Sequence, residues 1–367
     1  MDQQWIIAIL SGESRGVGPG MARVGLALVE GPYRVATRLR RWAYRCGLLP
    51  SADAGVPVVS VGNITTGGTG KTPMVAWVVR RLRELRRRPA VLMRGYKAVG
   101  GQSDEAEVLR IELGRAAGLL PRAARATLMA PLPNDVAVFV QADRRAAARE
   151  AVEAGADVLV MDDGFQHLRL RRDLDIVLID ATCPFGFGHV LPRGLLREGL
   201  SALKAARALV ITHADTPDKP SLDDLRRQLA RLAPQATIHA AAHRPTRLTD
   251  QDGEVKDVAE LAGKRVLAFC GLGNPRQFFD MLKVLGADLA ATQAFDDHVH
   301  YGPRELGEVE KLAAARKAEV LVTTQKDAVK LPTGWLSRPL WKLAVEMEIV
   351  EGREELVARI QAALRQG

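Results

Sequence analysis

Short apolar runs alternate with helical patterns along the first part of the chain. The runs are rich in Val, Ile and Leu, which is typical of strands buried on both faces of a sheet. Stretches such as 73–87 and 144–154 lie between them and have helical patterns. This alternation predicts a doubly wound, mostly parallel α/β sheet that binds ligands at the carboxyl ends of its strands. The predicted strands cover residues 56–61, 90–93, 135–140, 158–161, 175–179 and 208–211.

The alternation restarts near residue 217 and predicts a second, smaller α/β domain. We therefore expect four parts in the chain. They are an N-terminal helical segment over 1–50, a core over 51–216, the smaller domain over 217–350, and a C-terminal helix over 351–367 that can pack back on the core. In the second half, the predicted strands cover 237–241, 265–269, 289–292, 319–322 and 342–347, and the helices cover 277–285, 303–316 and 354–363.

The N-terminal segment has a strong charge bias, with six arginines and no lysine or aspartate over residues 22–49. Pro32 suits the start of a helix and Gly47 suits its end. Helical spacing puts an apolar stripe beside a row of arginines. The stripe consists of Val35, Leu39, Trp42 and Cys46, and the row consists of Arg34, Arg38, Arg41 and Arg45. Two interpretations remain: a helix lying in a membrane interface, or a helix packed on the protein body with solvated arginines.

The composition is that of a globular protein. The chain has 367 residues, of which 47% are apolar and 26% charged, and this excludes a disordered or fibrous protein. Cys46, Cys183 and Cys270 are too far apart for a disulfide framework or a CxxC metal site, so we expect a reducing compartment. No apolar run reaches the roughly 18 residues of a membrane span, and the N-terminus lacks the basic segment of a signal peptide. The net charge of +9 indicates an anionic partner.

A glycine-rich loop lies between the first predicted strand and a helix, which is the context of a phosphate-binding loop. Glycines let backbone N–H groups converge on phosphate oxygens, and a helix N-terminus favours negative charge. Lys71 can reach the β- and γ-phosphates, and the Thr72 hydroxyl can ligate Mg²⁺. Thr65 stands where the usual pattern has glycine. The candidate nucleotide-binding residues are Thr65, Thr66, Gly67, Gly68, Thr69, Gly70, Lys71 and Thr72.

A second motif, Asp-Asp-Gly-Phe-Gln-His at 162–167, follows another apolar strand. An acid at the end of such a strand is where a nucleotide-binding sheet places its Mg²⁺ partner. Asp162 and Asp163 are consecutive, so they point to opposite faces and are expected to have different roles. One can hold the Mg²⁺ shell while the other meets the substrate or a lysine. His167 taken alone is more typical of a hydrogen-bonded structural residue than of a catalyst.

Other polar clusters also follow predicted strands. Arg-Gly-Tyr-Lys lies at 94–97, Asp-Glu at 104–105, Asp-Arg at 143–144 and Pro-Arg-Gly-Leu-Leu-Arg-Glu at 192–198. Each alone indicates a surface loop or a helix cap. Together they place arginines and carboxylates at the ligand-binding edge of the sheet, and arginines suit planar phosphate recognition.

Two clusters in the second half carry candidate chemistry. Phe-Asp-Asp-His-Val-His-Tyr at 295–301 offers acids and histidines at short spacing, but the pattern of a third metal ligand is missing. A histidine that helps a carboxylate act as a base fits a kinase better. Thr-Thr-Gln-Lys-Asp-Ala-Val-Lys at 323–330 follows a strand and indicates a loop with an N-capped helix that can contact nucleotide.

Taken together, these motifs resemble the tetraacyldisaccharide 4′-kinase family, the lipid A 4′-kinases. The resemblance covers nearly the whole chain, from the arginine-rich helix to about residue 330. The sequence departs from the family pattern at Ser103, Ala106, Asp296 and Gln325, and none of these changes removes a reactive group. The motifs that carry the resemblance lie at 61–73, 94–96, 103–105, 162–167, 192–198, 295–298 and 323–329.

The resemblance implies a fold, an activity and a location. Two domains close around ATP and the headgroup of a lipid. The γ-phosphoryl group of ATP passes to the 4′-hydroxyl of a tetraacylated glucosamine disaccharide 1-phosphate and gives lipid IVA, with Mg²⁺ as cofactor. The family is peripheral on the cytoplasmic face of the inner membrane, so the apolar stripe would meet acyl chains and the arginine row anionic headgroups. No nucleic acid and no obligate protein partner is implied.

The resemblance also implies roles for individual residues. Asp104 would accept the proton of the sugar hydroxyl, assisted by His298. Lys71 and Thr72 would bind phosphate and Mg²⁺. The catalytic or metal-linked residues would be Asp162 and Asp163, and the candidate substrate-binding residues are Arg94, Tyr96, Arg144, Gln166, His167 and Arg197. Positive charge at the γ-phosphoryl group would come from Lys71, Mg²⁺ and Arg197 or Arg144.

Two other classes of protein share part of this pattern. A P-loop GTPase or metallochaperone ATPase would have the same loop tail, but Thr66 stands where such ATPases carry a signature lysine, and Thr-His-Ala-Asp at 212–215 is a poor guanine motif. A nucleic-acid-binding protein would fit the basic pI of about 9.7. A nucleic-acid-binding surface would need aromatic side chains that stack on bases among its basic residues. In the basic helix, only Trp42 and Tyr44 are interleaved with the arginines.

Overall fold

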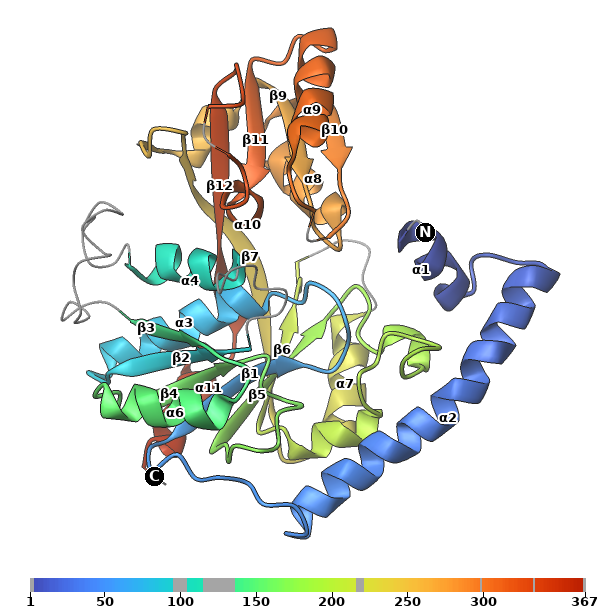
Figure 1. Cartoon of the computed structure of the whole chain (residues 1–367), viewed down its shortest axis with the longest axis vertical. Helices are drawn as coiled ribbons and strands as arrows, with labels where there is room; N and C mark the ends of the chain where they lie inside the picture. The colour runs from blue at the N-terminus through green and yellow to red at the C-terminus, as the bar shows by residue number, and fades with distance from the viewer. Residues whose placement is uncertain are drawn as a thin grey trace. The chain divides into compact units, whose positions relative to one another are not determined.

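The structure is a computed structural model and divides the chain into two units (Figure 1). It describes residues 3–94, 104–114, 136–215, 221–297, 299–332 and 334–365. The larger unit comprises Met1–Ala242 with Met347–Gly367, and the smaller comprises His243–Glu346. Two long strands, β7 (Thr237–Thr249) and β12 (Leu340–Glu351), run from one unit into the other. The boundary between the two units therefore falls inside β7 and not at the expected residue 217. The helix that follows residue 220 belongs to the larger unit, because its Leu225 and Leu229 are buried in a core cluster of that unit.

The larger unit is built on a parallel sheet with the strand order β7-β6-β5-β1-β4-β2-β3. Strand β1 lies in its middle, paired in parallel with β4 on one side and β5 on the other. The predicted doubly wound parallel sheet is confirmed. The strands are β1 (Val58–Asn63), β2 (Pro89–Met93), β3 (Ala137–Val140), β4 (Val158–Asp162), β5 (Leu174–Asp180) and β6 (Ala208–Thr212).

Helices cover both faces of this sheet, which is why its central strands are rich in apolar residues and buried along nearly their whole length. Within β5, Ile176 and Leu178 belong to one core cluster while Val177 and Ile179 belong to another, as the period of two of a strand requires. The first face packs against α3 (Lys71–Glu84), α4 (Asp104–Gly114) and α11 (Arg353–Ala363). The second packs against α6 (Arg144–Glu153), α7 (Leu222–Leu232) and the 3₁₀ helix η3 (Leu200–Ala205).

The smaller unit is also an α/β layer structure, as predicted. Its parallel strands have the order β10-β9-β11-β12, and each face of β9 has its own core cluster. Thr324 caps a short helix that follows β11, because its side chain accepts a hydrogen bond from the Asp327 N–H, 3.1 Å away. The elements are β8 (Val255–Lys256), η4 (Val258–Leu261), β9 (Arg265–Cys270), α8 (Pro275–Val284), β10 (Asp288–Ala294), α9 (Pro303–Ala315), β11 (Val320–Thr324) and α10 (Gln325–Ala328).

The N-terminal region forms α1 (Gln3–Ser11) and one long helix, α2 (Val17–Arg45). The expectation that Pro32 starts a helix is wrong, because Pro32 lies inside α2. A proline in a helix interior removes one backbone hydrogen bond. Pro32 is exposed, so water can bond the carbonyl that loses its donor.

Candidate active site

The glycine-rich loop connects the end of β1 to the start of α3, at the carboxyl edge of the larger sheet. Gly67 and Gly70 have φ angles of 119° and 83°, a region that glycine adopts without strain. Gly70 is the N-cap of α3 and supplies no side-chain cap, so the first N–H groups of the helix can bind an anion. A Cβ on Gly67 or Gly68 would meet nothing within 4 Å. The loop therefore presents open backbone to a phosphate group.

The two acids predicted beside this loop do lie next to it. Asp162 ends β4 in register with Val61 of β1, and it is buried. Asp163 follows with a φ of 50°, a left-handed conformation that is uncommon for a residue other than glycine. The chain therefore leaves the regular strand conformation at Asp163, directly after the buried Asp162.

Three cations surround Asp163. Arg197 Nη1 donates to both carboxylate oxygens of Asp163, at 2.8 Å each. Lys71 Nζ lies 3.8 Å from Asp163 Oδ1. Arg144, which is 3% exposed, donates from Nη1 to the Asp163 backbone carbonyl at 3.1 Å. The residues predicted from the glycine-rich loop, the acid pair and two of the arginine clusters thus meet at one point.

The charges in this cluster offset the cost of burying them. Burial raises the pKa of the Asp163 carboxyl, but the charges of Lys71, Arg197 and Arg144 and the Arg197 hydrogen bond bring that pKa below its ordinary value. Burial lowers the pKa of Arg144, while the charges of Asp162 and Asp163 act in the opposite direction. Asp163 is therefore ionised at neutral pH and holds the surrounding cations together.

Arg197 reaches this point because the 192–198 segment pairs with the glycine-rich loop. Thr66 N–H donates to the Leu195 carbonyl, and Arg197 N–H donates to the Ile64 carbonyl, both at 2.8 Å. The segment turns tightly at Gly194, where a Cβ would lie 2.3 Å from the His189 carbonyl oxygen. A substitution at Gly194 would therefore displace the loop that carries Arg197.

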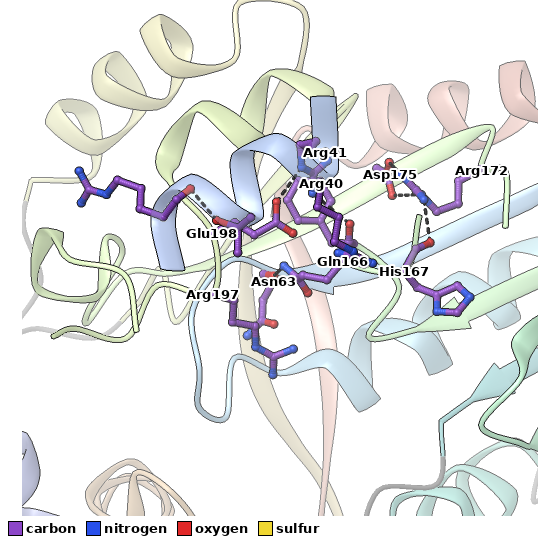
Figure 2. A network of polar contacts seen from close by, with 12 residues as sticks. Arg40, Arg41, Asn63, Gln166, His167, Arg172, Asp175, Arg197 and Glu198 are labelled. Atoms are coloured by element: carbon purple, nitrogen blue, oxygen red, sulfur yellow. Dashed lines mark hydrogen bonds and ion pairs between the residues drawn. The ribbon is translucent and has the colours of Figure 1, made fainter. Parts of the chain in front are cut away.

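Gln166 and His167 follow the acid pair in the sequence, and Figure 2 shows Gln166 beside Asn63. Gln166 Nε2 donates to the Asn63 carbonyl at 2.9 Å, which ties this segment to the start of the glycine-rich loop. Burial, followed by the charge of Arg144 and neighbouring arginines, lowers the pKa of His167 to about 4. His167 is therefore a neutral imidazole at physiological pH.

Sequence reasoning missed two glycines that let these segments approach one another. A Cβ on Gly62 would lie 2.7 Å from the Phe165 Cβ, and a Cβ on Gly164 would lie 2.6 Å from Ser60 Oγ. Both distances are too short for any side chain. Glycine at the end of a strand, and glycine directly after a strand-end acid pair, were the available signals.

The remaining predicted residues fall at or outside the limits of the described chain. Arg94 follows β2 and is exposed, and its charge contributes to the lowered pKa of Arg144. Asp104 begins α4, but its side chain lies outside the described residues. Tyr96 and His298 also lie outside them.

The donors around the loop suit Mg²⁺ bound together with a nucleotide. Thr72 lies in the first turn of α3, directly after Lys71, whose Nζ is 3.8 Å from Asp163 Oδ1. Asp162 is the last residue of β4 and precedes Asp163. Among the described residues, no group of three or more His, Cys, Asp or Glu side chains could hold a metal ion. Mg²⁺ is usually held by one or two carboxylates together with substrate phosphates and waters, so this donor set fits Mg²⁺ and ATP.

The fold and site define a P-loop nucleotide-binding protein, with an uncapped glycine-rich loop between β1 and α3 and an acid pair at the end of the adjacent strand. The family model described as tetraacyldisaccharide-1-P 4′-kinase matches residues 22–365. The chain belongs to this family.

Curated proteins and one solved structure agree with this assignment. The chain is 42% identical to a tetraacyldisaccharide 4′-kinase of Anaeromyxobacter sp. (strain K), over 94% of this chain and 91% of that protein. It is 38% identical to the protein of the same name from Geobacter sulfurreducens, over 92% of this chain and 93% of that protein. It is also similar to the crystal structure of the "apo" form of LpxK from Aquifex aeolicus in complex with ATP, with a TM-score of 0.70 and 26% identity, over 94% of this chain and 99% of that one.

Proposed function

We propose that the glycine-rich edge of the larger unit carries out the reaction of this family. The enzyme is an ATP-dependent lipid kinase that transfers the γ-phosphoryl group to the 4′-hydroxyl of tetraacyldisaccharide 1-phosphate and gives lipid IVA. The observation that carries this proposal is the convergence of Lys71, Arg197 and Arg144 on Asp163, directly beside an open phosphate-binding loop.

The loop residues 65–72 hold the ATP phosphates through backbone N–H groups, and the Lys71 ammonium pairs with the β- and γ-phosphates. Thr72, Asp162 and Asp163 would hold Mg²⁺, which neutralises phosphate charge when it is bound. Phosphoryl transfer depends on positioning and charge stabilisation more than on covalent chemistry. Arg197 and Arg144 add positive charge where the transferred group gathers negative charge.

The acceptor is activated by a base. Asp104, assisted by His298, accepts the proton of the 4′-hydroxyl. The sugar oxygen then forms a bond to the γ-phosphorus, the bond from that phosphorus to the bridging oxygen breaks, and ADP leaves with the electron pair. Arg94, Tyr96, Gln166 and His167 are the proposed contacts to the disaccharide headgroup.

The test of the reaction is the identity of the product. Purified protein is mixed with ATP, Mg²⁺ and tetraacyldisaccharide 1-phosphate in detergent micelles, and the lipid product is examined by mass spectrometry and ³¹P NMR. The proposal expects one added phosphate and a new monoester signal on the 4′-oxygen, with the 1-phosphate retained. A lipid-independent ATPase that leaves the acceptor unchanged would contradict it.

The outer face of α2 supports a location at a membrane surface. Its apolar residues recur at spacings of three, four or seven, which keeps them on one side of the helix, and they are exposed, with Val17 at 81%, Leu28 at 74% and Trp42 at 54%. Arg34, Arg38 and Arg45 are exposed beside this stripe. The stripe consists of Val17, Met21, Val24, Leu28, Val35, Leu39 and Trp42.

A long exposed apolar stripe flanked by arginines is the pattern of a helix that lies in a lipid interface. Within the part of the chain that the structure describes, no helix is both long enough and apolar enough to span a bilayer. We therefore propose that α2 holds the enzyme on the membrane surface, at the cytoplasmic face of the inner membrane, where ATP and the lipid acceptor meet.

Vesicle flotation tests this location. Leu28→Asp with Trp42→Asp places two charges on the stripe, and the double variant is expected to leave anionic vesicles that bind the wild type. The matched control is Val284→Asp, because Val284 is 86% exposed on α8 of the smaller unit. Equal flotation of the double variant and the wild type would contradict the proposal.

A further inference from the structure

The inner face of α2 contacts the two segments that carry the Asp163–Arg197 pair. Glu30 accepts from the Val190 N–H at 3.1 Å, and the Tyr33 hydroxyl donates to the Arg197 carbonyl at 3.0 Å. Arg40 Nη2 donates to the Gln166 carbonyl at 3.0 Å. These contacts lie on the side of the helix opposite the exposed apolar stripe. The proposed membrane helix is therefore also a support of the catalytic edge.

Arg41 joins the two segments directly. Its Nε donates to Glu198 Oε2 at 2.7 Å, and its Nη2 donates to the Phe165 carbonyl at 3.2 Å. The guanidinium also lies 4.6 Å from the centroid of the Phe165 ring. Figure 2 shows Arg40 and Arg41 pointing from α2 toward the segments that contain Gln166 and Glu198.

The two partners of Arg41, Phe165 and Glu198, are close in the sequence to Asp163 and Arg197. Phe165 follows Asp163 by two residues, and Glu198 follows Arg197 directly. The Arg41 bridge thus runs beside the Asp163–Arg197 hydrogen bonds and connects the same two stretches of backbone. The Arg41 and Glu198 side chains are only 17% and 6% exposed, so removing one partner leaves the other charge poorly solvated.

We infer that Arg41, through Glu198 and Phe165, is a positioning residue for Asp163 and Arg197, so that α2 is needed for turnover and not only for attachment to lipid. This inference rests on the proposed function, because it assigns Asp163 and Arg197 to phosphoryl transfer. Loss of the bridge lets the two segments shift against each other, and a misplacement of about 1 Å at a reacting site can cost about 100-fold in rate.

The experiment compares Arg41→Gln with Arg171→Gln in the full-length protein. The Arg171–Asp53 ion pair, with atoms 3.2 Å apart, is exposed and involves neither segment, so it is a matched control. We measure kcat and the KM for ATP with the lipid acceptor in micelles, together with vesicle flotation and the melting temperature. Arg41→Gln is expected to lower kcat at least 10-fold while the KM for ATP and flotation change less than threefold. The control is expected to keep wild-type kcat.

A double-mutant cycle separates positioning from general destabilisation. If Arg41 acts through Arg197, Arg41→Gln adds little to the kcat loss of Arg197→Ala, because the two changes remove the same arrangement. Arg41→Lys keeps the charge but loses the planar fork, and it is expected to have an intermediate kcat; it serves as the test variant if Arg41→Gln does not fold. Multiplicative losses, or wild-type kcat in a folded Arg41 variant, would overturn the inference. If the wild type forms no phosphorylated lipid, the proposed function fails instead.

Discussion

Arg197 Nη1 lies 2.8 Å from both carboxylate oxygens of Asp163. This relationship joins a loop after η2 (Gly186–Gly188) to the end of β4, across 34 residues of sequence. It leaves Arg197 held in one orientation at the mouth of the phosphate-binding loop. A preorganised cation stabilises developing charge without reorganising during the reaction.

Replacing Arg197 by alanine is therefore expected to lower kcat by about 100-fold, because the proposed role of this arginine is that of a preorganised donor to the transferred group. Steady-state transfer to the lipid acceptor measures the effect. Arg193→Ala is the control in the same loop, since Arg193 donates to the Leu10 carbonyl at 3.0 Å and not to Asp163. An unchanged kcat in Arg197→Ala would show that this arginine does not stabilise the transferred group.

The Asp163 carboxylate predicts a pH dependence of stability. Because its folded-state pKa lies below the ordinary value of 3.8, the carboxylate contributes stability that is present above pH 3.8 and is lost as the pH falls through the lowered pKa. Asp163→Asn is expected to lower the free energy of unfolding by a constant amount between pH 8 and about pH 5. Urea unfolding across that range checks this. A difference that disappears near pH 6 would contradict the assignment.

His167 also predicts a loss of stability on acidification, in a pH range above that of Asp163. Its folded-state pKa of about 4 lies below the ordinary 6.5, so the unfolded chain binds a proton that the folded chain does not bind between these values. The wild type therefore loses stability as the pH falls from 6.5 to 4. His167→Asn removes this titration and is expected to lose less stability between pH 7.5 and 4.5. Parallel curves for the two proteins would refute the assignment.

The close approach at Gly62 predicts a packing defect. Gly62→Ala would place a methyl group 2.7 Å from the Phe165 Cβ, so the free energy of unfolding is expected to fall by about 2 kcal/mol. Gly25→Ala is the contrasting change, because Gly25 lies in α2 with nothing within 4 Å of a Cβ, and alanine favours helix by about 1 kcal/mol. Denaturant unfolding compares the two variants. Equal stability of Gly62→Ala and the wild type would contradict this account of the close approach between Gly62 and Phe165.

The fold could be predicted because its strands are apolar on both faces and each is followed by a helix. β1, β4 and β5 lie where the sequence pattern places them, and the glycine-rich loop follows β1. The start of α2 could not be predicted from local rules, since Pro32 is a stronger signal for a helix start than for a helix interior.

The site was predictable where chemistry follows a strand directly, as at Lys71 and the Asp162–Asp163 pair. The supporting contacts were not, because they join distant segments and carry no local signal. The helical pattern places Arg41 in the arginine row that would meet lipid headgroups, yet its side chain binds Glu198, 157 residues away. Only the folded structure distinguishes an arginine that faces solvent from one that faces the protein.

The most direct test of the central claim is transfer of labelled phosphate from ATP to tetraacyldisaccharide 1-phosphate by the wild type and by Lys71→Ala. Lys71 Nζ lies 3.8 Å from Asp163 Oδ1, at the loop that is proposed to hold the phosphates. The account predicts Mg²⁺-dependent labelling of the lipid by the wild type and a loss of at least 100-fold in the variant. Unlabelled lipid from folded, ATP-binding wild-type protein, or full activity in Lys71→Ala, would contradict it.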